Sequence, residues 1–197
     1  MVLPYNAQVT AYLEVEAQGG KKIDIRTDTY TYSTSGISNS VKTAYITKDG
    51  RQTFESLGWF SGEKVIYTIP AGVKILSLGY RESGYDTDFT GSFVSDDPAL
   101  NTLWQKAVRT LYVTMRDNYM DCPDRERAQW WGDVTNEMYM TFYSLDKRSW
   151  ELYEKGLYTK LGFIQNDILY TVVPNTNYYA ELPMQELAGV VGVWEYY

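Results

Sequence analysis

The side chains of this chain that could do chemistry are concentrated in residues 121–133, which read DCPDRERAQWWGD. Its acids include Asp121, Glu126 and Asp133, and they stand among two arginines and two adjacent tryptophans. Carboxyl groups in different environments can divide the acid and base roles that cleavage of a sugar bond needs. A tryptophan face packs against the apolar C–H surface of a sugar ring. The residue types therefore point to acid–base chemistry on a carbohydrate.

The same charges also have a purely structural interpretation. Glu126 and Asp133 can balance Arg125 and Arg127 as an ion-paired helix N-terminus, and that outcome is the more common one for an arbitrary sequence. The functional interpretation needs the acids to converge. The Cys-Pro step at 122–123 disfavours a helix, so residues 121–125 are expected to form a loop. A helix predicted from Gln129 onward would then place Trp130 and Asp133, three residues apart, on one face.

Composition excludes several other mechanisms. The chain of 197 residues has no histidine, which removes Ser-His-Asp, Cys-His and histidine–metal chemistry. Its single cysteine, Cys122, cannot form an internal disulfide and has no histidine to activate it, so a small packed residue is the simpler interpretation. The net charge of −7 and the absence of a long Lys/Arg run argue against nucleic-acid or anionic-membrane partners. No apolar stretch is long enough for a transmembrane helix, and the first residues do not resemble a signal peptide, so the compartment stays undetermined.

The first half of the chain reads as β-structure. Residues 9–16 and 23–30 alternate apolar and polar side chains at period two. The Gly19-Gly20 pair between them predicts a hairpin turn, and Asp49-Gly50 predicts a second turn. Short strands separated by such turns favour an antiparallel β-sandwich, which we assign to residues 1–95. Its first strands read like the middle of a domain, so we expect this domain to be truncated at its start.

The period changes at residues 95–98, where Asp97 suits an N-cap and Pro98 suits the first helical position. An apolar stripe at three-four spacing then predicts a helix to about Asn118: Leu100, Leu103, Trp104, Ala107, Val108, Leu111, Tyr112 and Met115. Further helices are predicted over about 129–145 and 149–159, and from Pro183 onward. The last one lacks a C-cap glycine and a basic final turn, so residues 96–197 are expected to be the first part of a longer helical domain.

The segment 121–133 resembles the signature of the bacterial α-L-rhamnosidases, glycoside hydrolase family 78. In that family an Asp-Cys-Pro stretch leads through an Arg and a Glu to Trp-x-Gly-Asp. Residues 79–86, 91–93 and 109–117 are similar to the junction between strands and barrel in these enzymes. The resemblance implies an α+β chain in two parts: an antiparallel β-sandwich followed by an incomplete (α/α)6 catalytic barrel.

The resemblance also implies roles for single residues. Glu126 matches the general acid, which protonates the leaving oxygen. Asp121 and Arg125 match residues that hold the rhamnose hydroxyls, Trp130 matches the tryptophan lining the sugar pocket, and Asp133 matches a further sugar-contacting acid. The implied partner is a rhamnosyl glycoside, and no metal or cofactor is implied.

Two departures from the family pattern matter. Many members have one more residue between the arginine and the glutamate, so Asp124 competes with Glu126 for the acid role, although the spacing to Asp133 supports Glu126. The family's general base is a glutamate further along than this chain extends. Glu181 and Glu186 are the late glutamates near a turn, but Glu186 is more simply a first-turn residue favoured by the helix dipole.

The sequence thus predicts part of an inverting α-L-rhamnosidase, inactive in isolation and prone to self-association through uncovered barrel faces. Three alternatives stay open: another (α/α)6 glycosidase with a different sugar, a fragment that binds carbohydrate without turnover, and a purely structural fragment. Tyr178-Tyr179 either lines a sugar subsite or packs on a neighbouring helix. The aglycone and the linkage cannot be predicted.

Overall fold

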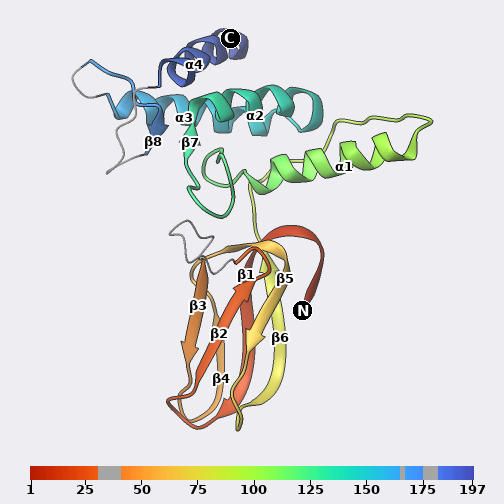
Figure 1. The fold of residues 1–197 in the computed structure, drawn as a ribbon, viewed down its shortest axis with the longest axis vertical. Helices are drawn as coiled ribbons and strands as arrows, with labels where there is room; N and C mark the ends of the chain where they lie inside the picture. Colours follow the sequence, from red (N-terminus) through yellow and green to blue (C-terminus); the bar gives the residue numbers. More distant parts are fainter. Residues whose placement is uncertain (31–40, 165–166, 175–181) are drawn as a thin grey trace. The chain divides into compact units, whose positions relative to one another are not determined.

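A computed structural model of the protein describes residues 1–30, 41–164, 167–174 and 182–197 (Figure 1). The chain divides into two compact units, Met1–Ser83 and Gly84–Tyr197, except that Pro123–Arg125 group with the first. The first unit is built from strands and the second mainly from helices. The predicted α+β class is therefore confirmed.

Six strands form the first unit as one curled antiparallel sheet. They are β1 (Val2–Ala17), β2 (Lys22–Thr27), β3 (Lys42–Ile46), β4 (Gly50–Glu55), β5 (Phe60–Thr68) and β6 (Lys74–Glu82). The order is β3-β2-β5-β1-β4, and β6 also pairs with β1. The long strand β1 pairs through its second half with both β4 and β6, while β5 pairs first with β1 and then with β2. Strand β5 therefore connects the β2-β3 part of the sheet with the part formed by β1, β4 and β6.

The core of this unit follows from the period-two pattern. Val9, Ala11, Leu13 and Val15 of β1 point to one side and are fully buried. They belong to one apolar cluster with residues of other strands, namely Ile23, Ile25, Phe60 and Val65. Each large side chain buried in this way stabilises the fold by about 1.5–3 kcal/mol. The sequence pattern thus identified the buried face of the sheet.

The Gly19-Gly20 turn is present, but the prediction of a hairpin there was wrong. Strand β2 pairs with β3 and β5 and not with β1, so the chain reverses and crosses to another part of the curled sheet. Gly20 adopts a φ of 84°, which glycine tolerates best, and its N–H donates to the Thr47 carbonyl at 2.8 Å. A turn signal specifies a reversal of the chain, whereas the partner strand is chosen by packing of the sheet faces.

The second unit contains the four predicted helices: α1 (Pro98–Val113), α2 (Trp131–Ser144), α3 (Arg148–Gly162) and α4 (Pro183–Tyr196). A short pair of strands, β7 (Gln129–Trp130) and β8 (Val172–Val173), lies between them in the sequence. Helix α1 begins as predicted, because Asp97 accepts the Ala99 N–H at 2.8 Å and Pro98 occupies the first turn. No helix in the described part of the chain is both long and apolar enough to cross a membrane.

Helix α1 ends about five residues before the predicted end. Thr114 is its C-cap, and the Thr114 hydroxyl donates to the Leu111 carbonyl at 2.7 Å. A threonine hydroxyl that bonds its own backbone competes with helix continuation. Beyond it, Met115 and Tyr119 form an antiparallel bridge, and both are fully buried. The chain therefore turns tightly here, and the loop that carries the acids begins directly afterwards, at residue 121.

Helix α2 forms the centre of the second unit. Its predicted apolar face is confirmed, since four of its five residues are buried and Phe142 is half-buried: Trp131, Thr135, Met138, Phe142 and Leu145. Helix α4 packs closely on it, as the ribbon of Figure 1 shows. Thr135 donates its hydroxyl to the Ala188 carbonyl of α4 at 3.1 Å.

The segment that precedes α1 is held by ion pairs and hydrogen bonds to the turn between α2 and α3. Arg148 forms ion pairs with Asp86 at 3.0 Å, Asp88 at 2.7 Å and Asp146 at 2.7 Å. The Gly91 N–H donates to the Ser144 carbonyl at 3.0 Å. The hydrogen bond from Arg148, above all, lowers the pKa of Asp146 to about 2.

Candidate functional site

The predicted acids lie on a closed loop that precedes α2. The Asp121 N–H donates to the Ala128 carbonyl at 3.0 Å, and the Asp121 carboxylate accepts the Ala128 N–H at 3.1 Å. This double contact joins the two ends of residues 121–128. Arg127 near the end of the loop has a φ of 54°, a conformation that non-glycine residues seldom adopt. The tight return brings Glu126 back beside Asp121.

Asp121, Cys122 and Glu126 form one cluster of polar side chains. One carboxylate oxygen of each acid and the cysteine sulfur lie within 4.8 Å of one another. The Cys122 thiol donates to Glu126 Oε2 at 3.0 Å, and the Glu126 N–H donates back to the sulfur at 3.3 Å. Glu126 is exposed, whereas Asp121 and Cys122 are half-buried. These donor atoms could hold a divalent cation, although acid pairs of this kind are common without one.

The two carboxyl groups are electrostatically linked. Burial, above all, together with a hydrogen bond and the charge of Glu126, raises the pKa of Asp121 to about 6. The Ala128 N–H and the Cys122 thiol oppose this shift because they stabilise the carboxylate form. The pKa values of two strongly interacting groups belong to the pair and not to either residue alone. The cluster can therefore carry a transferable proton nearer neutrality than an isolated carboxyl would.

Trp130 and Asp133 lie near the start of α2, but not as predicted. Trp130 is the half-buried N-cap residue and belongs to β7, where it pairs with Val172. Asp133 is exposed in the first helical turn. The prediction that the helix includes Gln129 and Trp130 was wrong, because these two residues pair with β8, more than 40 residues later in the chain. The local sequence does not predict a pairing between residues that lie so far apart in the chain.

Arg125 and Asp124 belong to the three residues that group with the first unit. Arg125 is exposed. The Asp124 carboxylate accepts a hydrogen bond from the Thr29 hydroxyl at 3.0 Å. Asp124, the alternative acid, thus has a structural partner in that unit.

Glu137 is a further acid beside the site that the sequence analysis did not single out. It lies one helical turn after Asp133 and is buried. Burial first, and then the charges of Asp133 and Asp121, raise its pKa well above the usual range, while a hydrogen bond with Thr114 opposes the shift. A signal existed in the sequence, because a glutamate next to Met138 interrupts the apolar face of α2.

The other conspicuous residues of the motif build the start of α2. Trp131 is fully buried, with the Lys160 amine 4.4 Å from its ring centroid, so it belongs to the core and not to a sugar-binding surface. The Gly132 N–H donates to the side-chain oxygen of Gln185 from α4. A Cβ at position 132 would lie 2.7 Å from that oxygen, so only glycine admits this contact without displacement. The motif therefore also fixes where α4 packs.

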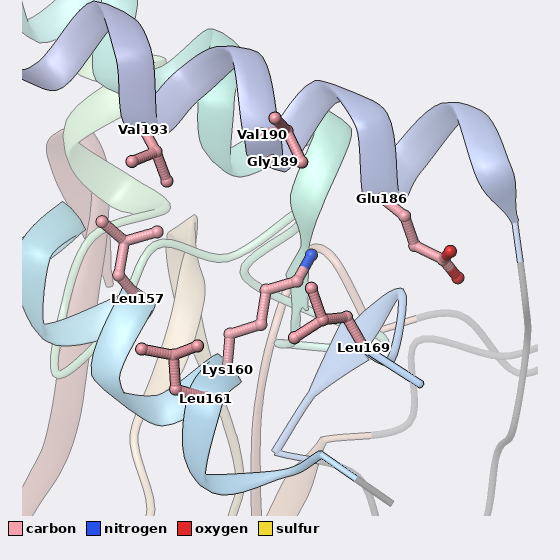
Figure 2. A pocket seen from close by; sticks show the side chains of 8 residues that line it. All are labelled: Leu157, Lys160, Leu161, Leu169, Glu186, Gly189, Val190 and Val193. Carbon is pink, nitrogen blue, oxygen red and sulfur yellow. The ribbon is translucent and has the colours of Figure 1, made fainter. Parts of the chain in front are cut away.

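A separate apolar pocket of about 260 Å³ lies between α3 and α4 (Figure 2). It is lined by Leu157, Lys160, Leu161, Leu169, Glu186, Gly189, Val190 and Val193. The buried Lys160 side chain extends from α3 toward the Gly189 backbone, and burial lowers the pKa of its amine to about 8. No residue predicted to contact sugar lines this pocket.

Glu186, one of the two late glutamates considered as a base, is a first-turn residue of α4 and accepts a hydrogen bond from the Thr171 hydroxyl at 3.3 Å. Its place in the first turn agrees with the simpler structural interpretation. Glu181, Tyr178 and Tyr179 lie outside the described residues.

Comparison with known proteins gives a consistent result. A family model described as the six-hairpin glycosidase domain of bacterial α-L-rhamnosidases matches residues 88–197, more than half of the chain. No curated protein matches the sequence significantly.

Three solved structures share the fold over 99% of the chain. They are the family 78 rhamnosidase of Bacillus sp. GL1 (23% identity, TM-score 0.79), a rhamnose-bound rhamnosidase from Klebsiella oxytoca (13%, 0.81) and an α-L-rhamnosidase from Dictyoglumus thermophilum (20%, 0.75). The chain spans 21%, 42% and 23% of their respective lengths.

The chain thus combines a sheet unit with a helical unit, and a pair of carboxyl groups lies just before α2. The family match makes the assignment specific: this chain belongs to the bacterial α-L-rhamnosidase family with a six-hairpin glycosidase domain.

Proposed function

We propose that this chain carries the acid half of the active site of an inverting glycoside hydrolase that removes terminal α-L-rhamnosyl residues. The observation that supports this most strongly is the Asp121–Glu126 pair on a closed loop, whose carboxyl oxygens lie within 4.8 Å of each other and in which the pKa of Asp121 is raised to about 6. Glu126 is the exposed member, so its carboxyl is accessible to the oxygen of a bound glycoside. Asp121 is half-buried, and its raised pKa favours the protonated form of its carboxyl group.

In the proposed mechanism Glu126 protonates the leaving oxygen. Asp121, Arg125 and Asp133 bind the sugar hydroxyls, and the Trp130 ring packs against the apolar face of the sugar. Inversion needs a second carboxylate about 6.5–9.5 Å away to activate water on the opposite face. We assign that general base to a part of the full enzyme that residues 1–197 do not include. The isolated chain is then catalytically silent, since each assisted proton transfer is typically worth about 10²–10⁴-fold in rate.

We further propose that residues 1–95 are part of a β-sandwich domain and residues 96–197 the first part of an (α/α)6 barrel. The family match over residues 88–197 supports the second assignment, because six helical hairpins define that domain. Helices α1 to α4 would be its first helices. The limited share of each related structure that this chain spans is consistent with a larger whole.

Hydrolysis of an aryl α-L-rhamnoside by the full-length enzyme tests the function, with the matching aryl α-L-fucoside and β-D-glucoside as controls. We expect turnover of the rhamnoside at least about 10²-fold above that of the controls, since substituents that a site is built to bind are discriminated strongly. Turnover of another sugar instead would identify a different glycosidase. Calorimetric binding of rhamnose without any turnover would identify a carbohydrate-binding protein and contradict the proposal.

A further inference from the structure

Cys122 lies between the two carboxyl groups of the candidate site. Its sulfur is 3.0 Å from Glu126 Oε2 and also accepts the Glu126 N–H at 3.3 Å. Its sulfur also lies within 4.8 Å of an oxygen of the Asp121 carboxyl. The thiol therefore hydrogen-bonds the backbone and the carboxyl of the proposed general acid and lies near the carboxyl of Asp121.

These surroundings decide which chemistry the thiol can do. Neighbouring carboxylates disfavour a thiolate, which is the nucleophilic form, and the chain has no histidine to deprotonate the thiol. The protonated thiol, in contrast, is a hydrogen-bond donor. Cys122 is thus unsuited to attack a substrate and suited to hold a carboxyl group in place.

Glu126 needs such a contact because its side chain is exposed. An exposed glutamate samples several rotamers, and fixing a long side chain costs up to about 2 kcal/mol of conformational entropy. A general acid must present its proton within hydrogen-bond distance of the leaving oxygen. The two contacts to Cys122 restrict the Glu126 backbone through its N–H and the Glu126 carboxyl through Oε2.

We propose that Cys122 is a positioning residue for the general acid, whose thiol orients the Glu126 carboxyl and stabilises its charged form. The catalytic part of this statement rests on the proposed role of Glu126. Donation to a carboxylate favours its ionised form, and the nearby thiol also opposes the rise in the pKa of Asp121.

A titration of the carboxyl pair tests the proposal without any need for turnover. Carboxyl carbon resonances of Asp121 and Glu126 are followed by NMR against pH in the chain and in its Cys122→Ala and Cys122→Ser variants. We expect the upper pKa of the pair to rise by a few tenths to about one pH unit in Cys122→Ala, because the donor is lost. Serine restores a hydroxyl donor and should return the titration toward that of the unmodified chain. Superimposable titrations in all three proteins would overturn the proposal.

The reactivity of the thiol provides a second measurement that holds even if Cys122→Ala does not fold. The rate of alkylation by iodoacetamide is measured near neutral pH in the chain and in Glu126→Gln. Removing the adjacent negative charge favours the thiolate, so the rate should increase about three- to tenfold. Asp117→Asn removes an exposed charge elsewhere and is the matched control, with a change below about twofold. Equal rates in the chain and in Glu126→Gln would show that the thiol is not coupled to Glu126.

In the full-length enzyme the same variants separate positioning from substrate binding. We expect Cys122→Ala to lower kcat about two- to tenfold with little change in KM, the equivalent of one modest hydrogen bond. The alkaline limb of its pH profile should move to higher pH, and Cys122→Ser should restore both properties. An unchanged profile with unchanged kcat contradicts the proposal. A full-length enzyme without activity on rhamnosides would instead refute the proposed function, while the titration and alkylation results would stand by themselves.

Discussion

At the scale of single residues, the half-buried carboxyl of Asp121 links pH to stability. Its pKa is about 6 in the folded protein and about 4 in an unfolded chain. A raised folded-state pKa contributes stability below about pH 4, and this contribution is lost as the pH rises through about 6. The wild-type chain therefore bears a cost near neutral pH that an uncharged residue at position 121 avoids.

We expect Asp121→Asn to gain stability relative to wild type between about pH 4 and pH 7. The gain should stay near 1 kcal/mol or less, because solvent screens a half-exposed carboxyl. Urea unfolding at both pH values, followed by circular dichroism of the helices, measures it. The exposed-site variant Asp117→Asn should show no such pH dependence. A stability difference that is independent of pH would mean that burial and Glu126 do not raise the pKa of Asp121.

The sequence predicted which acids share the loop, but not all of their surroundings. The Cys-Pro step indicated a loop at residues 121–125, and the backbone contacts between Asp121 and Ala128 close it. The proximity of the Asp121 and Glu126 carboxyl groups depends on side-chain geometry that residue spacing does not encode. Glu137 was overlooked because apolar periodicity identifies buried apolar side chains and does not identify a buried carboxyl group. Trp130 was assigned to a helix because its β partner lies far along the chain.

At the scale of elements, the crossing of α2 and α4 depends on two glycines of α4 that face different neighbours. A Cβ at Gly192 would lie 2.2 Å from the buried Tyr153 hydroxyl and 2.7 Å from Thr135 Oγ1. A Cβ at Gly189 would meet the end of the flexible Lys160 side chain at 3.0 Å. Gly192 therefore allows α2 and α4 to pack closely. A small side chain at position 189, in contrast, could be accommodated by a shift of Lys160.

We expect Gly192→Ala to destabilise the helical unit by about 1–3 kcal/mol, since overpacking costs more than helix propensity returns. Gly189→Ala is the matched control and should be nearly neutral, because alanine favours the helix by up to about 1 kcal/mol and the Lys160 amine can move aside. Thermal unfolding of both variants checks this. Equal losses at the two positions would contradict the described crossing.

The Arg148 cluster predicts a second dependence on pH, of opposite sign to that of Asp121. The pKa of Asp146 is lowered to about 2, so its ion pair contributes stability above about pH 4 that is lost as the pH falls toward 2. Arg148→Gln should lower the melting temperature at neutral pH and flatten its decline in acid. Lys147→Gln, at an exposed neighbouring position, serves as control. An acid profile of Arg148→Gln identical to wild type would refute the contribution of this cluster.

Element starts were predicted better than element ends and partners. Asp97 and Pro98 located the start of α1 because capping is a local interaction. The end of α1 depends on the Thr114 hydroxyl and on the buried turn at Met115 and Tyr119, which the three-four spacing does not reveal. The partner of β2 likewise depends on the packing of the curled sheet and not on the Gly19-Gly20 turn.

At the scale of the whole molecule, several apolar side chains of α4 are exposed in the described part of the chain. Val190 is 61% exposed, Val191 51% and Trp194 76%. On α1, Leu103 of the predicted stripe is 61% exposed. Contiguous exposed apolar surface of this kind promotes association.

We expect the isolated chain to associate at micromolar concentration, and the double variant Val191→Glu with Trp194→Glu to reduce its mass in light scattering toward that of a monomer. The control is Leu57→Glu, which adds one charge at a fully exposed position of the first unit and should leave the mass unchanged. A wild-type chain that is cleanly monomeric would refute this expectation and leave the proposed chemistry untouched.

The most direct test of the central claim is the dependence of Glu126→Gln on the leaving group in the full-length enzyme. Glutamine keeps the size of the side chain but cannot give up a proton. Turnover of rhamnosides with poor alkyl leaving groups should fall by at least about 10²-fold, whereas activated aryl rhamnosides, which need little protonation, should lose much less. Equal losses on both substrate classes would contradict the account, because Glu126 would then position the sugar and another residue would be the acid.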